Sequence, residues 1–174
     1  MNFAILAILV ACTYATFAEE VKSKEGPIFE RRIYIGVPAE KVWDALTNPA
    51  TASKYFLVPL QKLELKSGGQ VVYGRDKAMI EGKVVEVVQG SKLVHTFSFA
   101  PEGHPGSEAD PPSRVSYFIQ PMGDMCVLEL RHDRFPSENQ TFHNISGGWD
   151  VMLSAMKTLL ETGKLLPWPK PTPK

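Results

Sequence analysis

The sequence predicts an α+β fold in which a curved antiparallel sheet of seven strands wraps around one long C-terminal helix. Across residues 137–163, apolar residues recur at spacings of three and four, which is the period of one helix face. Across residues 60–135 the period changes to two and short turns separate the segments, which is typical of an antiparallel meander. A helix of this length needs a large apolar surface to lie on, and the preceding sheet supplies one.

Three elements are expected before the meander. Residues 28–36 alternate between apolar and polar side chains, which predicts a first strand. A short helix is expected over residues 38–46, because Pro38 suits the first turn of a helix. Asn48 and Pro49 end this helix and predict the start of a second short helix, which runs as far as residues 55 and 56.

The meander divides into six candidate strands, at residues 61–66, 70–75, 77–88, 92–100, 114–121 and 125–134. Glycine-containing turns at 67–69, 89–90 and 122–124 connect neighbouring strands. The longest break in the pattern covers residues 101–113. Because this segment is rich in Pro, Gly and acidic residues, we expect it to form a loop.

The C-terminal helix carries signals for both of its ends and one irregularity. Ser137 followed by Gln140 indicates a capping box at the start, and Gly163 stands where a helix commonly ends in a left-handed glycine. Gly147 and Gly148 lie inside the helix, where each costs about 1 kcal/mol relative to alanine. We expect a local bend or a close approach of the helix to the sheet as the compensation.

Length and charge place the chain among ordinary globular proteins of one domain. The 174 residues include 19 Lys and Arg and 19 Asp and Glu, so the formal net charge is zero. This balance gives no electrostatic footprint for nucleic acid or an anionic membrane surface, and nucleic acid is not expected as a partner. The sequence has no Gly-x-Ser-x-Gly motif, P-loop or dinucleotide fingerprint, and no cofactor is expected.

The N-terminal segment has the features of an export signal. Residues 1–18 contain no charged residue, are largely apolar and end in small residues, which predicts a signal peptide cut after Ala18. The protein is therefore expected to be exported, periplasmic or secreted. No Lys or Arg lies near the start, which leaves open an uncleaved anchor or a buried first helix. Residues 9–12 also resemble a lipobox, in which Cys12 would be lipidated and the protein would be a lipoprotein.

The remaining boundaries follow from composition. We expect a flexible lead-in at 19–27, one domain at 28–166 and a Pro-rich tail at 167–174. A membrane is expected as a partner only through the N-terminal segment or lipidated Cys12. The mature domain keeps only Cys126, so an intrachain disulfide is excluded, and its strand pattern predicts a buried small hydrophobic residue.

Two motifs resemble those of a known superfamily. Residues 37–49, VPAEKVWDALTNP, resemble the opening "PAEKVWxALTxP" of the START-related helix-grip (SRPBCC) proteins. The C-terminal helix resembles their closing motif "GWxxxLxxLKxLLExG" through Gly147, Gly148, Trp149, Leu153, Lys157, Leu159, Leu160, Glu161 and Gly163. Within the superfamily the pair is most similar to the branch named after the activator of the heat-shock-protein-90 ATPase. The resemblance covers roughly residues 29–166.

The resemblance implies a helix-grip fold with a cavity between sheet and helix that takes apolar small molecules. Members of the superfamily include lipid-transfer proteins, plant hormone and allergen-type binders, aromatic cyclases and co-chaperones. Most members of this branch are cytosolic, whereas this chain has the features of an exported protein. This departure puts a co-chaperone role in doubt.

The alternation of the strands predicts which side chains face the interior. The candidate ligand cavity consists of His95, Phe97, Phe99, Tyr117, Ile119, Leu128, Trp149, Met152 and Met156. The same alternation directs Cys126 and His132 inward. Such an aromatic and methionine-rich interior suits an apolar ligand. The alternative is a filled core without a usable cavity.

Among these residues, His95 and Tyr117 are the candidates for a polar contact with a ligand or for a catalytic role. His95 on an apolar strand face can orient a ligand or act as an acid or base, although such a histidine more often bonds a neighbour. Tyr117 can donate its hydroxyl group to a ligand while its ring packs. The histidines and cysteines show no metal-ligand spacing, so no metal site is expected.

These observations favour an exported binding protein for an apolar or amphipathic small molecule held between the sheet and the C-terminal helix. An enzyme of the cyclase or hydrolase kind that uses the same cavity is the first alternative. A chaperone-like module with a protein partner is the second, and it predicts an exposed apolar patch.

Overall fold

The computed structural model describes residues 26–167 apart from 102, 105 and 108. The predicted signal peptide at 1–18, Cys12, most of the lead-in at 19–27 and nearly all of the tail at 167–174 lie outside the described residues. Seven strands and three helices are described, at β1 (Phe29–Ile35), α2 (Ala39–Thr47), α3 (Pro49–Ala52), β2 (Leu60–Leu63), β3 (Gln70–Gly74), β4 (Ala78–Val88), β5 (Lys92–Phe99), β6 (Ser113–Met122), β7 (Met125–Asp133) and α4 (Gln140–Thr162).

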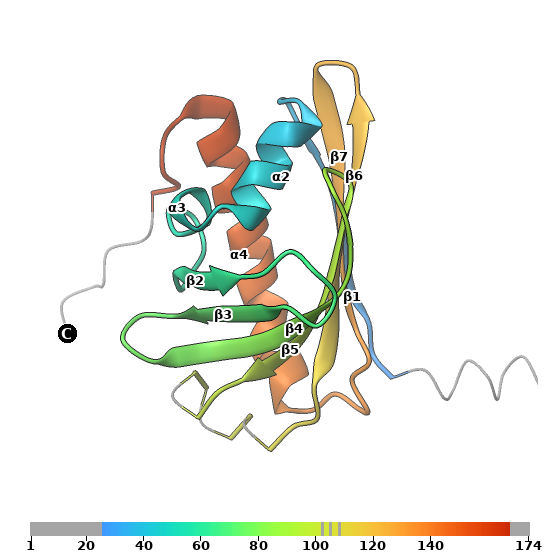
Figure 1. Ribbon diagram of the computed structural model, residues 1–174, viewed down its shortest axis with the longest axis vertical. Coiled ribbons are helices and arrows are strands. Elements are labelled where there is room, and N and C mark those ends of the chain that lie inside the picture. The colour runs from blue at the N-terminus through green and yellow to red at the C-terminus, as the bar shows by residue number, and fades with distance from the viewer. Residues whose placement is uncertain (1–25, 102, 105, 108, 168–174) are drawn as a thin grey trace, which may run out of the picture.

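The predicted architecture is confirmed. The strands form one antiparallel sheet in the order β1-β7-β6-β5-β4-β3-β2, so that the first strand of the chain pairs with the last. The sheet curves around α4, and α2, which contacts α3, lies beside the C-terminal half of α4 (Figure 1). The core fills the space between the concave face of the sheet and the helices. No helix of the described residues is long and apolar enough to cross a membrane.

Two elements are shorter than the sequence predicts. Helix α3 ends at Ala52, because the chain closes a tight turn in which the N–H groups of Tyr55 and Phe56 both donate to the carbonyl of Ala52. The Tyr55 hydroxyl then donates to the Ala45 carbonyl at 2.9 Å, which holds its ring in the core. Strand β2 ends at Leu63, because the chain then turns, with the Lys66 N–H donating to the Glu64 carbonyl and the Gly69 N–H to the Lys66 carbonyl.

The start of α4 differs from the predicted capping box. Asn139, not Ser137, is the N-cap, and its side-chain oxygen accepts a hydrogen bond from the Phe142 N–H at 3.0 Å. The carboxylate of Asp110 accepts hydrogen bonds from both the N–H and the hydroxyl group of Thr141, at 2.8 and 2.7 Å. Two side chains thus satisfy N–H groups that a helix start leaves without partners.

Gly163 ends the helix as predicted, with a left-handed φ of 69°. The expected close approach at Gly147 and Gly148 is wrong. A Cβ atom at Gly147 would meet nothing within 4 Å, and one at Gly148 would meet only the Leu57 side chain, at an ordinary contact distance of 3.6 Å. No atom of the sheet comes near enough to require glycine at either position.

The polar face of α4 closes the open edge of β1. Lys157 donates to the Tyr34 carbonyl at 2.8 Å, and the Glu161 carboxylate accepts from the Gly36 N–H at 2.6 Å. Arg31 also forms an ion pair with Asp150 at 2.6 Å. An edge strand with free backbone groups invites pairing with another chain, so these side chains both hold the helix and protect the edge.

We expect Asn139→Ala to lower the free energy of unfolding by about 1 kcal/mol, because it removes the cap of the Phe142 N–H. Ser137→Ala is the matched control and should leave stability unchanged, since Asn139 is the residue that caps the helix. Urea unfolding of both variants measures the difference. A larger loss in Ser137→Ala than in Asn139→Ala would contradict this assignment of the cap.

Candidate functional site

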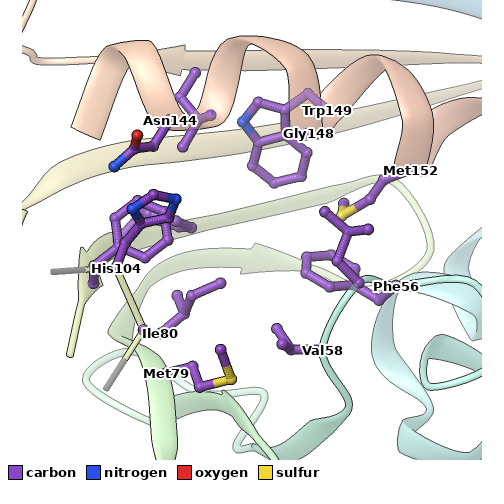
Figure 2. A pocket seen from close by; sticks show the side chains of 14 residues that line it. Phe56, Val58, Met79, Ile80, His104, Asn144, Gly148, Trp149 and Met152 are labelled. Atoms are coloured by element: carbon purple, nitrogen blue, oxygen red, sulfur yellow. The ribbon is translucent and has the colours of Figure 1, made fainter. Parts of the chain in front are cut away.

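A pocket of about 210 Å³ lies between the first half of α4 and one end of the sheet. Its lining is mainly apolar and consists of Phe56, Leu57, Val58, Met79, Ile80, Phe97, Phe99, Gly103, His104, Asn144, Ile145, Gly148, Trp149 and Met152. These residues come from the segment after α3, the start of β4, the end of β5, the loop that follows it, and α4 (Figure 2).

The walls of the pocket follow from the two periodicities of the chain. On β5, Phe97 and Phe99 are two residues apart and therefore share the inner face of the sheet. On α4, Ile145, Gly148 and Met152 fall at spacings of three and four and therefore share one face of the helix. Because Gly148 has no side chain, the helix leaves space at this point of the wall.

Aromatic rings form the inner end of the pocket. The Phe56 ring stacks on Tyr73 with a centroid distance of 4.4 Å and meets Trp149 edge-on at 6.2 Å. The Tyr117 ring in turn lies edge-on to Trp149 at 6.1 Å. The pocket therefore ends against a layer of rings, and Tyr73 and Tyr117 stand behind that layer.

The polar groups of the pocket lie at its rim. Asn144 donates to the Ser107 hydroxyl at 2.7 Å and accepts from Gln140 at 3.0 Å, so its amide ties the loop after β5 to α4. The exposed His104 ring lies 5.2 Å from the Phe99 ring. A ligand with an apolar body and a polar end would place the polar end at this rim.

A buried chain of hydrogen bonds fixes Trp149 in the wall. The Trp149 indole Nε1 donates to His132 Nδ1 at 3.0 Å, and His132 Nε2 lies 2.7 Å from the Ser113 hydroxyl oxygen. Because an indole nitrogen can only donate, Nδ1 of His132 carries no proton and Nε2–H donates to Ser113. The Ser113 hydroxyl then donates to the Phe97 carbonyl at 3.2 Å. This chain of hydrogen bonds links α4, β7, β6 and β5.

The environment of His132 keeps this chain of hydrogen bonds in one protonation state. The side chain is fully buried, and this burial lowers the pKa of His132 to about 3, with the neighbouring His95 acting in the same direction and Asp133 in the opposite one. The imidazole is therefore neutral at physiological pH. Only the neutral ring can accept from Trp149 and donate to Ser113 at the same time.

His95 has a different environment. Its side chain is 2% exposed, its Nδ1 lies 2.8 Å from the Thr96 carbonyl, and its Nε2 has no hydrogen-bond partner. Burial lowers the pKa of His95 to about 4, although the bond to Thr96 acts in the opposite direction. His95 is thus a neutral ring and a weak base at neutral pH. A buried polar atom without a partner costs about 1–3 kcal/mol.

The predicted cavity residues divide into two groups. Phe97, Phe99, Trp149 and Met152 line the pocket. His95, Tyr117, Ile119, Leu128 and Met156 are buried in the core and do not line it. The inner part of the predicted cavity is filled in this structure, and contact of these five residues with a ligand stays a prediction.

Several lining residues lie outside the positions that alternation and helical spacing predict, among them Phe56, Val58, Met79, His104 and Asn144. One signal was available, because residues 56–58 form an apolar run, Phe-Leu-Val, that begins at the end of the second predicted helix and continues into the segment before the next predicted strand. Ser113 was also missed, since its role depends on a cross-strand contact with His132 that no local pattern displays.

The described residues contain no group of three or more His, Cys, Asp or Glu side chains that could hold a metal ion. Cys126 is a free, buried thiol, as its strand pattern predicts. Burial, with a smaller effect from Glu40, raises the pKa of this thiol. A buried thiol with a raised pKa is a poor nucleophile, which fits a structural role for Cys126.

Residues 36–161 of the chain match the family of Activator of Hsp90 ATPase homolog 1-like proteins. No curated protein matches the sequence. The fold is similar to CalU16 from Micromonospora echinospora, with a TM-score of 0.63 and 22% identity over 76% of this chain and 73% of that one.

Two further solved structures share the fold. The Aha1 dimer from Colwellia psychrerythraea has a TM-score of 0.63 and 17% identity over 79% of this chain and 98% of that one. PFC0360w, an HSP90 activator from Plasmodium falciparum, has a TM-score of 0.62 and 23% identity over 78% of this chain and 96% of that one. At these identities the likeness shows the helix-grip fold alone.

We expect His132→Phe to lower the free energy of unfolding by about 1–3 kcal/mol, because the buried Trp149 N–H loses its acceptor. Trp149→Phe removes the donor, so the double variant should be less destabilised than the sum of the two single variants. The coupling energy from a urea-unfolding double-mutant cycle checks this expectation. Additive effects of the two substitutions would show that the bond does not contribute.

Proposed function

This chain belongs to the family of Activator of Hsp90 ATPase homolog 1-like proteins, and on that premise we propose that it binds an apolar or amphipathic small molecule in the pocket beneath α4. The observation that carries the proposal is the lining, in which Phe56, Met79, Trp149 and Met152 surround space that the helix leaves at Gly148 (Figure 2). Apolar walls with a few polar groups at the rim are typical of small-molecule sites.

The size of the pocket limits what it holds. An engineered apolar cavity of about 150 Å³ accepts one benzene ring, and pockets for drug-sized ligands begin at about 300 Å³. A pocket of about 210 Å³ therefore takes one or two rings or a short chain. A larger amphipathic molecule would extend past His104 and Asn144, where a polar end can remain in water.

We also propose that the protein acts outside the cytoplasm. The support is the uncharged, apolar segment of residues 1–18 with its small residues before the expected cut after Ala18. An exported binder would hold its ligand in the periplasm or the extracellular medium. As a lipoprotein it would do so at a membrane surface, through lipidated Cys12.

The family name supports a second candidate, in which the chain contacts a protein partner. The similar fold of PFC0360w, an HSP90 activator, supports the same candidate. Stimulation of the ATPase of purified Hsp90 by this protein would favour it. The enzyme alternative needs His95 and Tyr117 to contact a substrate, and both are buried and do not line the pocket in this structure.

Glycine substitutions in α4 test the small-molecule proposal. Gly148→Leu would place a side chain in the pocket, and we expect it to weaken binding of the fluorescent probe 1-anilinonaphthalene-8-sulfonate at least tenfold. Gly147→Ala is the matched control, because Gly147 is exposed and a Cβ atom there meets nothing within 4 Å. It should raise the free energy of unfolding by up to about 1 kcal/mol and leave probe affinity unchanged.

Fluorescence titration gives the affinities and thermal unfolding shows that each variant is folded. A folded Gly148→Leu variant that binds the probe as tightly as the unchanged protein would place the probe elsewhere and contradict the proposal. Gly148→Ala provides an intermediate step, because it adds a single methyl group at the same point of the wall.

A further inference from the structure

The unpartnered nitrogen of His95 belongs to a buried residue that stands two positions from Phe97, a residue of the pocket lining, on β5. Phe99, Phe97 and His95 occupy alternate positions of β5 and therefore point to the same, inner face of the sheet. Phe99 is half-buried at the mouth, whereas Phe97 and His95 are 4% and 2% exposed. This row of three side chains runs inward from the rim, and two strand residues span about 7 Å.

The hydrogen bonding of His95 decides what its free nitrogen can do. Nδ1 faces a carbonyl oxygen, which can only accept, so Nδ1 carries the proton and donates to Thr96. In the neutral ring the other nitrogen, Nε2, then presents a lone pair. In the described part of the chain the only other buried side-chain atom without a partner is Nδ2 of Asn139, which lies in a half-buried side chain at the start of α4.

A lone pair in an apolar interior accepts a hydrogen bond and repels another acceptor. A carboxylate or a ketone would oppose it, and an ammonium group would have to lose its water to reach it. A hydroxyl group fits, because it donates one hydrogen bond and carries no charge. The surrounding rings suit an apolar body on the same molecule, since Tyr117 lies 6.1 Å from His95 between centroids and Phe97 stands between His95 and the rim on the same face of β5.

We propose that the ligand of this pocket is an apolar alcohol or phenol whose hydroxyl group donates a hydrogen bond to Nε2 of His95. The inference rests on the proposed function, because it places the ligand in the pocket and extends it inward along β5. The rings at the inner end of the pocket must move before the hydroxyl group can reach Nε2 of His95. Met152 is the side chain best able to move, because it is unbranched and adapts to irregular space.

Three probes of nearly equal shape test the proposal by calorimetric titration. 2-Naphthol carries a hydroxyl donor, 2-methoxynaphthalene carries an oxygen that cannot donate, and naphthalene carries no polar atom. We expect the unchanged protein to bind 2-naphthol about tenfold more tightly than 2-methoxynaphthalene. In His95→Phe, which keeps a ring of similar size, that preference should disappear while naphthalene still binds. His143→Phe is the matched control, because His143 is exposed on α4 and does not line the pocket, and it should retain the preference.

The possible outcomes separate the two proposals. Equal binding of all three probes to the unchanged protein would mean that Nε2 accepts no hydrogen bond from a ligand, and that a buried water or no group at all is its partner. This result would overturn the inference but not the proposed function. A preference for 2-naphthol that persists in His95→Phe would overturn it as well. Failure of all three probes to bind would overturn the proposed pocket and the inference together. Thermal unfolding confirms that His95→Phe is folded. The variant loses the unpartnered Nε2 together with the Nδ1 bond to Thr96, so its Tm should stay close to that of the unchanged protein.

Discussion

The hydrogen bond from Trp149 to His132 is the contact on which the placement of the helix against the sheet depends. Apolar packing is non-directional, so a long amphipathic helix on a curved apolar surface can shift along it at little cost. The bond is directional and buried, and it continues through Ser113 to the Phe97 carbonyl on β5. Together with the side chains that tie α4 to the edge of β1, it sets both the position and the rotation of α4.

With the helix fixed in this way, the pocket is the space that the core does not fill. Helix α2 packs against α4, and its buried residues Val42, Trp43 and Leu46 belong to the same core as Leu153 and Met156 of α4. In the N-terminal half of α4, Gly148 contributes no side chain to the pocket wall, and Phe56, Met79 and Met152 surround the space that remains. A glycine within a helix lowers its stability, so the fold retains this space at some expense of helix propensity.

The sequence predicted the architecture closely because period and turn chemistry are local properties. The seven strands, the order of elements and the glycine at the end of α4 all follow from patterns within about ten residues. The site was predicted only in part. Phe97, Phe99, Trp149 and Met152 follow from alternation and helical spacing, whereas Phe56 and His104 reach the pocket from segments whose place depends on tertiary contacts. Asn144 lies on α4 but is polar, so the apolar spacing of the helix does not select it. The cap at Asn139 and the role of Ser113 likewise depend on three-dimensional neighbours.

The central claim is that the space beneath α4 holds an apolar molecule, and native mass spectrometry of the protein purified from its own host tests it most directly. Denaturing extraction of the same sample identifies any molecule that leaves the protein. We expect a reproducible bound mass, at one molecule per chain, that belongs to an apolar or amphipathic compound. A protein that is empty in repeated preparations and that also fails to bind apolar probes would contradict it.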